Sequence, residues 1–348
     1  MKKIKSVKVS NVIKEVSKKV VETPIVVIPP KVRTKSGLTL TMIFEGSSLN
    51  YGEGFGNVSE LKKESIGDNQ YTFCSRVALR YDIARVMGLL DGSNGPVAPI
   101  TNNKTVCQMP LNISISKYSE ADIFGYMATV DKNNKVDKNN KKDDDTDSKD
   151  VKGGAKVRTA VLRINPARSL YTFKNDTNFG ANHNFCKRAN ATPNPFVSEE
   201  HTSPYVYTVS LDLDEIGRDF ETNEIVISAE QRTQRVTDIL DALLNLSRHI
   251  KGRHEMLDPK FVIGGIYIRK SPYFQGFVKL MDESSTQKIN TDFLSSGVEL
   301  AGAANTQVGS VKGHYNNDFK KELGVEPTSV VTMFNSLKEQ VKAYYANA

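Results

Sequence analysis

The sequence predicts an α+β domain in which an antiparallel sheet carries two helices on one face. Two observations predict this class: several segments with the two-residue apolar period or the apolar composition of strands, and two segments with apolar residues at the three- and four-residue spacing of amphipathic helices. In chain order these segments read strand, helix, strand, strand, helix, strand, which is the ferredoxin-like order. The 348 residues suffice for one large domain or two ordinary ones.

The first strand is predicted at residues 38–45, where every second residue is apolar, as in a strand with one buried face. The first helix is predicted at residues 75–90, because Leu79, Ile83 and Leu90 fall on one face. Glycines and a proline directly after that segment end the helix.

The remaining elements follow the same two patterns. The second helix is predicted at residues 229–251, where Ser228 and Gln231 form a capping box and Lys251-Gly252 ends the helix. The other strands of the core are predicted at residues 159–164, 205–214 and 261–269, and a terminal helix at about 329–345.

Charge and composition divide the chain further. Residues 1–36 form a basic extension with ten Lys/Arg and two Glu, a net charge of +8; since the whole chain carries +7, the remainder carries −1. The extension could therefore contact phosphate, although a solvated tail explains its composition equally well. Residues 131–154 are rich in Asn, Lys and Asp with almost nothing to bury, which predicts a mobile polar insertion into the domain 37–348.

A glycine-rich loop follows the first strand, with the sequence NYGEGFGN at residues 50–57. Glycines let backbone N–H groups approach a phosphate closely, although the spacing is neither that of a P-loop nor that of a dinucleotide fingerprint. A flexible loop is the alternative. The candidate RNA-binding residues here are Asn50, Tyr51, Gly52, Gly54 and Asn57.

The start of the first helix is a second candidate for anion binding. Ser75 stands at the predicted N-terminus, and Arg76 and Arg80 follow one turn apart. Free N–H groups, the helix dipole and two fixed charges favour a phosphate. An N-capping serine with two solvated arginines is the alternative. Either way these groups could hold sugar-phosphate but could not read a base.

A long irregular stretch, about residues 174–204, carries three phenylalanines among polar and basic residues. Such a length without regular structure is typical of a functional or disordered segment. It could form a protruding arm in which an aromatic such as Phe185 wedges between bases while Lys187 and Arg188 hold phosphate. Local packing of each phenylalanine is the alternative.

The signals for catalysis are weak. Asp212, Asp214 and Glu215 could bind Mg²⁺, but acidic residues are ordinary at the turn after a strand. The chain has no H-E-x-x-H, no G-x-S-x-G and no C-x-x-C, so we expect no enzyme activity, no cofactor and no metal. It also has neither a secretory signal nor an apolar run long enough for a bilayer, which predicts a cytoplasmic protein without a membrane partner.

Five segments in the same order resemble one protein family. They are residues 38–57, 71–80 (YTFCSRVALR), 122–127 (DIFGYM), 157–170 (VRTAVLRINPARSL) and 207–217 (YTVSLDLDEIG). Together they are similar to the DevR-like CRISPR-associated backbone proteins of type I interference (Cascade) complexes, with I-B as the expected subtype. The similarity covers most of residues 38–280.

The resemblance implies a modified RNA-recognition-motif (RRM) palm, a helical fingers insertion at about 50–155 and an extended thumb within 174–204. Copies of such proteins polymerise head-to-tail along the guide crRNA as a helical filament, and each thumb displaces a base at regular intervals. The guide then pairs with target DNA in antiviral defence, beside other subunits of the complex. On this reading the backbone groove is lined by Asn50, Tyr51, Ser75, Arg76 and Arg80.

Two other functions stay open at this point. The chain could be a generic single-stranded RNA-binding or regulatory protein that uses the same sheet and basic extension. It could also be a metal-dependent nuclease that uses the acidic residues after the strand at 205–214, although the sequence favours this reading least.

Overall fold

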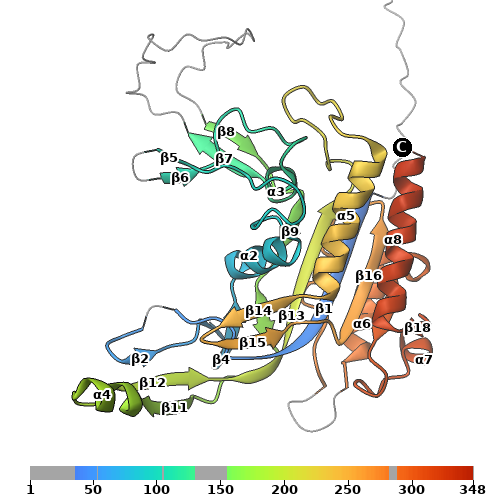
Figure 1. Cartoon of the computed structure of the whole chain (residues 1–348). Coiled ribbons are helices and arrows are strands. Elements are labelled where there is room, and N and C mark those ends of the chain that lie inside the picture. The colour runs from blue at the N-terminus through green and yellow to red at the C-terminus, as the bar shows by residue number, and fades with distance from the viewer. Residues whose placement is uncertain (1–35, 53, 104–105, 130–154, 282–287, 348) are drawn as a thin grey trace, which may run out of the picture. The chain divides into compact units, whose positions relative to one another are not determined.

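The computed structural model describes residues 36–52, 54–103, 106–129, 155–281 and 288–347 (Figure 1). The basic extension, apart from Ser36, and the polar insertion at 131–154 lie outside these residues, so what the sequence indicates for them stays a prediction. Helices and strands are mixed along the chain, which confirms the α+β class.

The described residues contain a nine-stranded sheet in the order β18-β17-β16-β1-β13-β10-β4-β3, with β9 also paired to β13. The long strand β1 lies at its centre and runs antiparallel to both β13 and β16. The strands are β1 (Gly37–Ser47), β3 (Lys63–Ile66), β4 (Asn69–Cys74), β9 (Leu162–Ile164), β10 (Ala167–Ser169), β13 (Thr202–Asp212), β16 (Phe261–Tyr267), β17 (Gln307–Ser310) and β18 (Pro327–Thr328).

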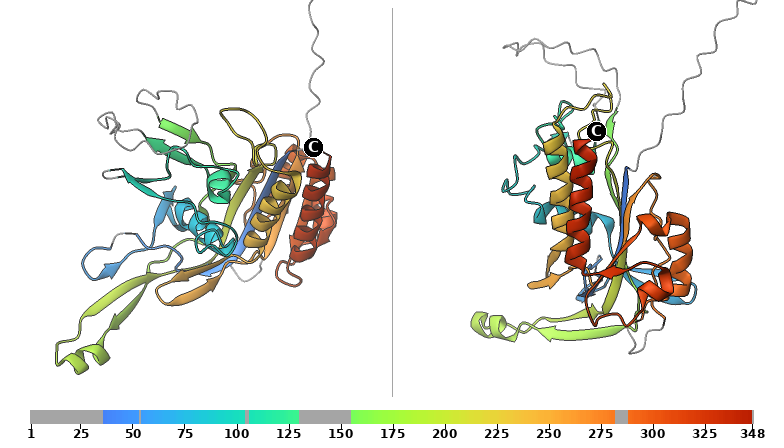
Figure 2. Two further views of the ribbon diagram at one scale, coloured as in Figure 1. Left: turned by 45° about the horizontal axis from the view of Figure 1, so that its top comes forward. Right: turned by 90° about the vertical axis from the view of Figure 1, so that its right-hand side faces the viewer.

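Helices cover both faces of this sheet (Figure 2). On one face α2 (Arg76–Val86), α5 (Ala229–Leu244) and α8 (Val330–Ala346) pack on alternate residues of β1 and β13. On the other face α6 (Thr291–Ala301) and α7 (Phe319–Leu323), which flank the short 3₁₀ helix η2 (Ala303–Asn305), pack on Ile43 and on residues of β16.

The first strand is therefore buried on both faces, and the prediction of one exposed face was wrong. Leu40, Met42 and Phe44 point toward α5 and α8, whereas Ile43 points into the core of the opposite face. The reason is the helical layer of α6 and α7, which begins about 250 residues later in the chain. The alternation of apolar residues within the strand does not indicate this second layer.

The second helix is shorter than the sequence predicts. It begins at the capping box of Ser228 and Gln231 as expected but ends at Leu244. The predicted last turn is instead an antiparallel hairpin of β14 (Ser247–Ile250) and β15 (Arg253–Met256). Lys251 and Gly252 both have positive φ, 45° and 76°, which suits a two-residue hairpin turn and not a helix.

Smaller sheets surround the main one. The expectation of an irregular stretch at 174–204 was wrong. This segment, which we call the thumb region, forms a ribbon of β11 (Asp176–Ala181) and β12 (Pro195–Glu200) with α4 (His183–Ala189) at its tip, and β2 (Val58–Ser59) pairs with β12. The fingers region contains β5 (Thr101–Asn103), β6 (Val106–Gln108), α3 (Ser119–Phe124), β7 (Tyr126–Thr129) and β8 (Ala155–Arg158).

The expectation of a helical fingers insertion was wrong for the described residues. Between 97 and 129 the structure contains one six-residue helix, α3, and otherwise short strands and loops. Moreover, β4 and α2, which fall within the expected range 50–155, belong to the main sheet and its core. A small core of its own supports the insertion, formed by Ala98, Met109, Ile113, Ile115 and Ala121.

One buried carboxylate joins this insertion to the main core. Asp122 of α3 has no exposed surface and accepts hydrogen bonds from Arg158, from Arg235 Nη1 at 2.5 Å and from the Gly217 N–H at 3.0 Å. Because these donors lie on β8, on α5 and in the loop before α5, one side chain positions three segments relative to one another.

No helix in the described part of the chain meets the length and hydropathy that a membrane span requires.

Candidate nucleic-acid interface

The end of β1 and the start of α2 meet, and we call this place the β1–α2 junction (Asn50, Tyr51, Ser75 and Arg76). Ser75 caps α2 by accepting a hydrogen bond from the Ala78 N–H at 3.3 Å. The side-chain amide of Asn50 lies 3.0 Å from the Ser75 hydroxyl, in either orientation of the amide. Arg76 is exposed beside them. Residues that are 25 positions apart in sequence are thus brought together at a helix N-terminus, where an anion is favoured.

The glycine-rich loop has a more structural role than the sequence indicates. The Gly52 N–H already donates to the Glu60 carbonyl at 2.8 Å. A Cβ on Gly54 would lie 2.2 Å from the Val58 carbonyl oxygen, so the close return of the chain requires glycine there. The Asn57 carbonyl accepts a bond from the Val197 N–H at 2.9 Å and thereby joins the loop to the thumb. Contacts of these three residues with RNA stay a prediction.

Tyr51 connects the junction to two other elements. Its hydroxyl donates to the Glu199 carbonyl, at the base of the thumb, at 3.0 Å. Its ring lies beneath Lys251, whose Nζ is 3.6 Å from the ring centroid. Sequence reasoning missed the second contact because it assigned Lys251 to a helix end.

The β14–β15 hairpin is attached firmly to the junction. Arg248 Nε donates to the Leu49 carbonyl at 2.7 Å, and Arg248 Nη1 pairs with Asp82 of α2 at 2.5 Å. Arg253 Nη2 donates to the Ser47 carbonyl at 3.1 Å.

Burial raises the pKa of the Asp82 carboxyl, and the charge and hydrogen bond of Arg248 oppose that rise. The Lys251-Gly252 dipeptide, read as a hairpin turn, is the one sequence signal that could have revealed this arrangement.

Arg80 is occupied by a different partner. Its Nη2 pairs with Glu120 at 3.1 Å, and its guanidinium lies 4.8 Å from the centroid of the Phe124 ring. Both partners belong to α3, so Arg80 joins α2 to the fingers insertion. Its contribution to an anion site is therefore smaller than the sequence indicates, because a carboxylate already offsets its charge.

The tip of the thumb region presents the three other candidates on α4. Phe185 is 68% exposed, and Lys187 and Arg188 are also exposed. The guanidinium of Arg188 lies 5.9 Å from the Phe185 ring centroid. Because α4 lies at the far end of the β11–β12 ribbon (Figure 1), an apolar ring and two cations share this tip. Contact of this tip with RNA stays a prediction.

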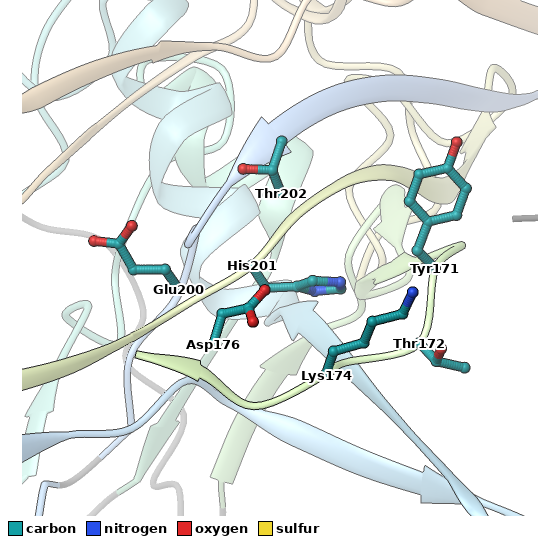
Figure 3. Close-up of a pocket in the computed structure, with 7 residues that line it drawn as sticks. All are labelled: Tyr171, Thr172, Lys174, Asp176, Glu200, His201 and Thr202. Atoms are coloured by element: carbon teal, nitrogen blue, oxygen red, sulfur yellow. The ribbon is translucent and has the colours of Figure 1, made fainter. Parts of the chain in front are cut away.

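A pocket of about 330 Å³ lies where the two thumb strands leave the sheet (Figure 3). Its charged side chains are Lys174, Asp176 and Glu200, beside the imidazole of His201. Two carboxylates make this pocket a poor place for a phosphate. We therefore do not include it in the candidate interface.

The acidic residues after β13 are paired with a lysine. Lys270 Nζ lies 2.6 Å from Asp212 and 2.8 Å from Asp214. Burial favours the neutral form of Asp214, but the hydrogen bonds from Lys270, Tyr344 and Ser36 outweigh it and lower its pKa to about 2. Glu215 lies 3.8 Å from Arg218. An ammonium group thus stands where a divalent cation would have to bind, and within the described ranges no three metal-binding side chains cluster.

Comparisons with known proteins point to one family. The family described as CRISPR-associated negative auto-regulator DevR/Csa2 matches residues 38–283. No curated protein matches the chain. A solved structure titled CRISPR RNA-guided surveillance complex, pre-nicking, is similar in fold, with a TM-score of 0.54, 9% identity, and coverage of 88% of this chain and 100% of that one. Another, titled CRISPR RNA-guided surveillance complex, gives a TM-score of 0.49 with 11% identity over 88% of this chain and 99% of that one.

Proposed function

Because this chain belongs to the DevR/Csa2 family of CRISPR-associated proteins, we propose that it is a non-catalytic backbone subunit of an interference complex that binds guide crRNA. Copies would assemble head-to-tail along the guide, whose bases then pair with target DNA. Such an open, heterologous contact gives a helical filament. The complex would be of type I, subtype I-B, and the chain would contact its other subunits there. Its location would be the cytoplasm.

The strand order supports an RRM-like palm as part of this proposal. The four strands β16-β1-β13-β9 are neighbours and are all antiparallel. Helices α2 and α5 pack on the same face of these strands. This is the order and the helix placement of a ferredoxin-like βαββαβ unit, to which RNA recognition motifs belong.

The observation that carries the proposal is the β1–α2 junction. There Asn50 and Ser75 lie together at a helix N-terminus, Arg76 is exposed beside them, and Tyr51 touches the base of the thumb. Such groups can hold phosphate and ribose but leave the base edges unread. A guide-binding subunit requires this combination, because its guide must stay free for pairing.

Purification of the chain with the RNA that it retains tests the proposal. Expressed beside a CRISPR array, the protein should retain RNA of uniform length and guide sequence, with several copies of the protein on each strand. Sequencing of the RNA and the mass of the particle measure both properties. A generic RNA-binding or regulatory role, which the words "negative auto-regulator" in the family's description keep open, gives mixed cellular RNA at one copy per strand.

Arg76 allows a sharper test of the junction. With a slope of about −0.7 per phosphate on single strands, loss of one contact weakens binding about fivefold at about 0.1 M salt, whatever the RNA sequence. We expect this for Arg76→Gln in a titration with labelled RNA. Lys342→Gln removes one exposed charge from α8 and is the control. Equal affinities for the two variants would contradict the assignment of the junction.

A further inference from the structure

The turn of the β14–β15 hairpin is a basic site that sequence reasoning did not identify. A cavity of about 420 Å³ is lined by residues 249–254, which include Lys251, Arg253 and two histidines but no acidic residue. His249 and His254 are directly opposite on the two strands, and their ring centroids lie 4.5 Å apart in an edge-to-face arrangement. Because successive residues of a strand point to opposite faces, the two imidazoles lie on one face of the hairpin and Arg253, opposite Ile250, lies on the other, with Lys251 in the turn between the strands.

The environment of Lys251 disfavours its charged form. Burial and the charge of Arg253 lower the pKa of Lys251, and the more distant charge of Glu200 opposes this effect. Burial and a neighbouring like charge both disfavour an ammonium group, and a bound anion offsets that cost. No carboxylate of the described residues forms a salt bridge with Lys251, which contacts the ring of Tyr51 instead.

The surrounding bonds fix Arg253 in place and offset part of its charge. Arg253 is oriented by the Ser47 and Ser48 carbonyls at 3.1 and 3.4 Å and lies 3.6 Å from Glu255. Arg248, one strand away, is paired with Asp82. Lys251 is therefore the cation of the hairpin that has no salt bridge with a carboxylate among the described residues, and its contact with the ring of Tyr51 places it at the β1–α2 junction.

We propose that the β14–β15 hairpin binds a phosphodiester group of the bound RNA strand through Lys251, the exposed turn residue whose ammonium group lies over the ring of Tyr51. This inference rests on the proposed function, because it assigns a second backbone contact to the same strand. A phosphodiester is the anion that a strand held at the neighbouring β1–α2 junction would present here, and phosphate contacts position a strand without reading its sequence.

Lys251→Asn is the variant that separates charge from folding. Position 251 has positive φ and precedes glycine, and Asn-Gly is a favoured pair for a two-residue hairpin turn. The substitution therefore removes the charge and preserves the turn. We expect a loss of about fivefold in affinity for a labelled single-stranded RNA at about 0.1 M salt, and a salt dependence shallower by about 0.7. Lys251→Arg, which retains the charge, should bind within about twofold of the wild type.

The matched control is Lys312→Asn, in the exposed Lys312-Gly313 turn after β17. It removes the same charge from another Lys-Gly dipeptide and should leave the affinity unchanged. If wild-type protein binds RNA but Lys251→Asn binds as well as Lys312→Asn, the hairpin site is refuted and the proposed function stands. If the wild type binds no RNA at all, both are refuted.

Discussion

The buried carboxylate of Asp122 gives the sharpest prediction about stability. Asp122→Ala removes the acceptor shared by Arg158 and Arg235, which are 5% and 7% exposed. It also leaves the Gly217 N–H without the acceptor that it has in the wild type. Two buried guanidinium groups would lose their counter-charge at once.

The size of the effect follows from what each arginine retains. Removing one partner of a buried ion pair costs about 3–5 kcal/mol. Arg158 keeps three backbone carbonyl acceptors and Arg235 keeps two, which hold the loss near the lower limit, about 3 kcal/mol. An unfolding entropy of about 2.1 cal/mol/K per residue over a domain of about 310 residues amounts to about 0.65 kcal/mol/K, so a loss of about 3 kcal/mol should lower the midpoint of thermal unfolding by about 4–5 °C.

Thermal and urea unfolding of the purified chain measure this change. Asp68→Ala is the control, because Asp68 is exposed in the turn between β3 and β4 and its loss should change the midpoint by less than about 2 °C. Asp122→Asn should resemble Asp122→Ala, since an amide keeps the shape but not the charge. If Asp122→Ala unfolds within about 2 °C of the control, the network does not hold the insertion to the core and the reasoning fails.

Three further predictions concern other positions. The pKa of Asp214 is lower in the folded chain than in the unfolded chain, so ionised Asp214 stabilises the fold above about pH 4, and this contribution is lost as the pH falls toward 2. In urea titrations the difference in unfolding free energy between wild type and Asp214→Asn should therefore shrink from pH 4 to pH 2. A difference that stays constant over this range would contradict the Lys270 pairing. Gly54→Ala should destabilise the chain by about 1–3 kcal/mol, because the new Cβ would overlap the Val58 carbonyl. Gly52→Ala, whose Cβ would approach nothing closer than 3.8 Å, should cost about 1 kcal/mol or less in the same unfolding assay. Phe185→Ala should leave the free energy of unfolding unchanged, because Phe185 is 68% exposed. A decrease in that free energy of more than about 1 kcal/mol would mean that the ring packs in the isolated chain.

The sequence predicted those parts of the fold that depend on local period. The first strand, the start of α2 at Ser75, the capping box of α5 and the terminal helix α8 were all predicted within a few residues. Each of these signals is contained in one short window of sequence. The end of α5 was not predicted, because Ile250 fits the apolar face of a continued helix and Lys251-Gly252 is compatible with a helix end as well as with a hairpin turn.

The candidate site could be predicted only in part, for the same reason. Local chemistry indicated Asn50, Ser75 and Arg76, and the structure brings them together at one helix N-terminus. Lys251 is 200 positions from Tyr51, and only the return of the chain through β14 and β15 places one over the other. No local pattern contains such a contact.

Arg80 shows why local charge is a poor measure of an anion site. By sequence it matches Arg76, one turn earlier on the same helix. In the fold Glu120, 40 positions later, pairs with it, and Phe124 covers it, so its charge serves the attachment of α3. The positive potential of the β1–α2 junction then depends on Arg76 together with the hairpin cations, not on two arginines of α2. A double substitution of Arg76 and Arg80 would mix a loss of binding with a loss of attachment, and for that reason the single substitutions of Arg76 and Lys251 are the informative ones.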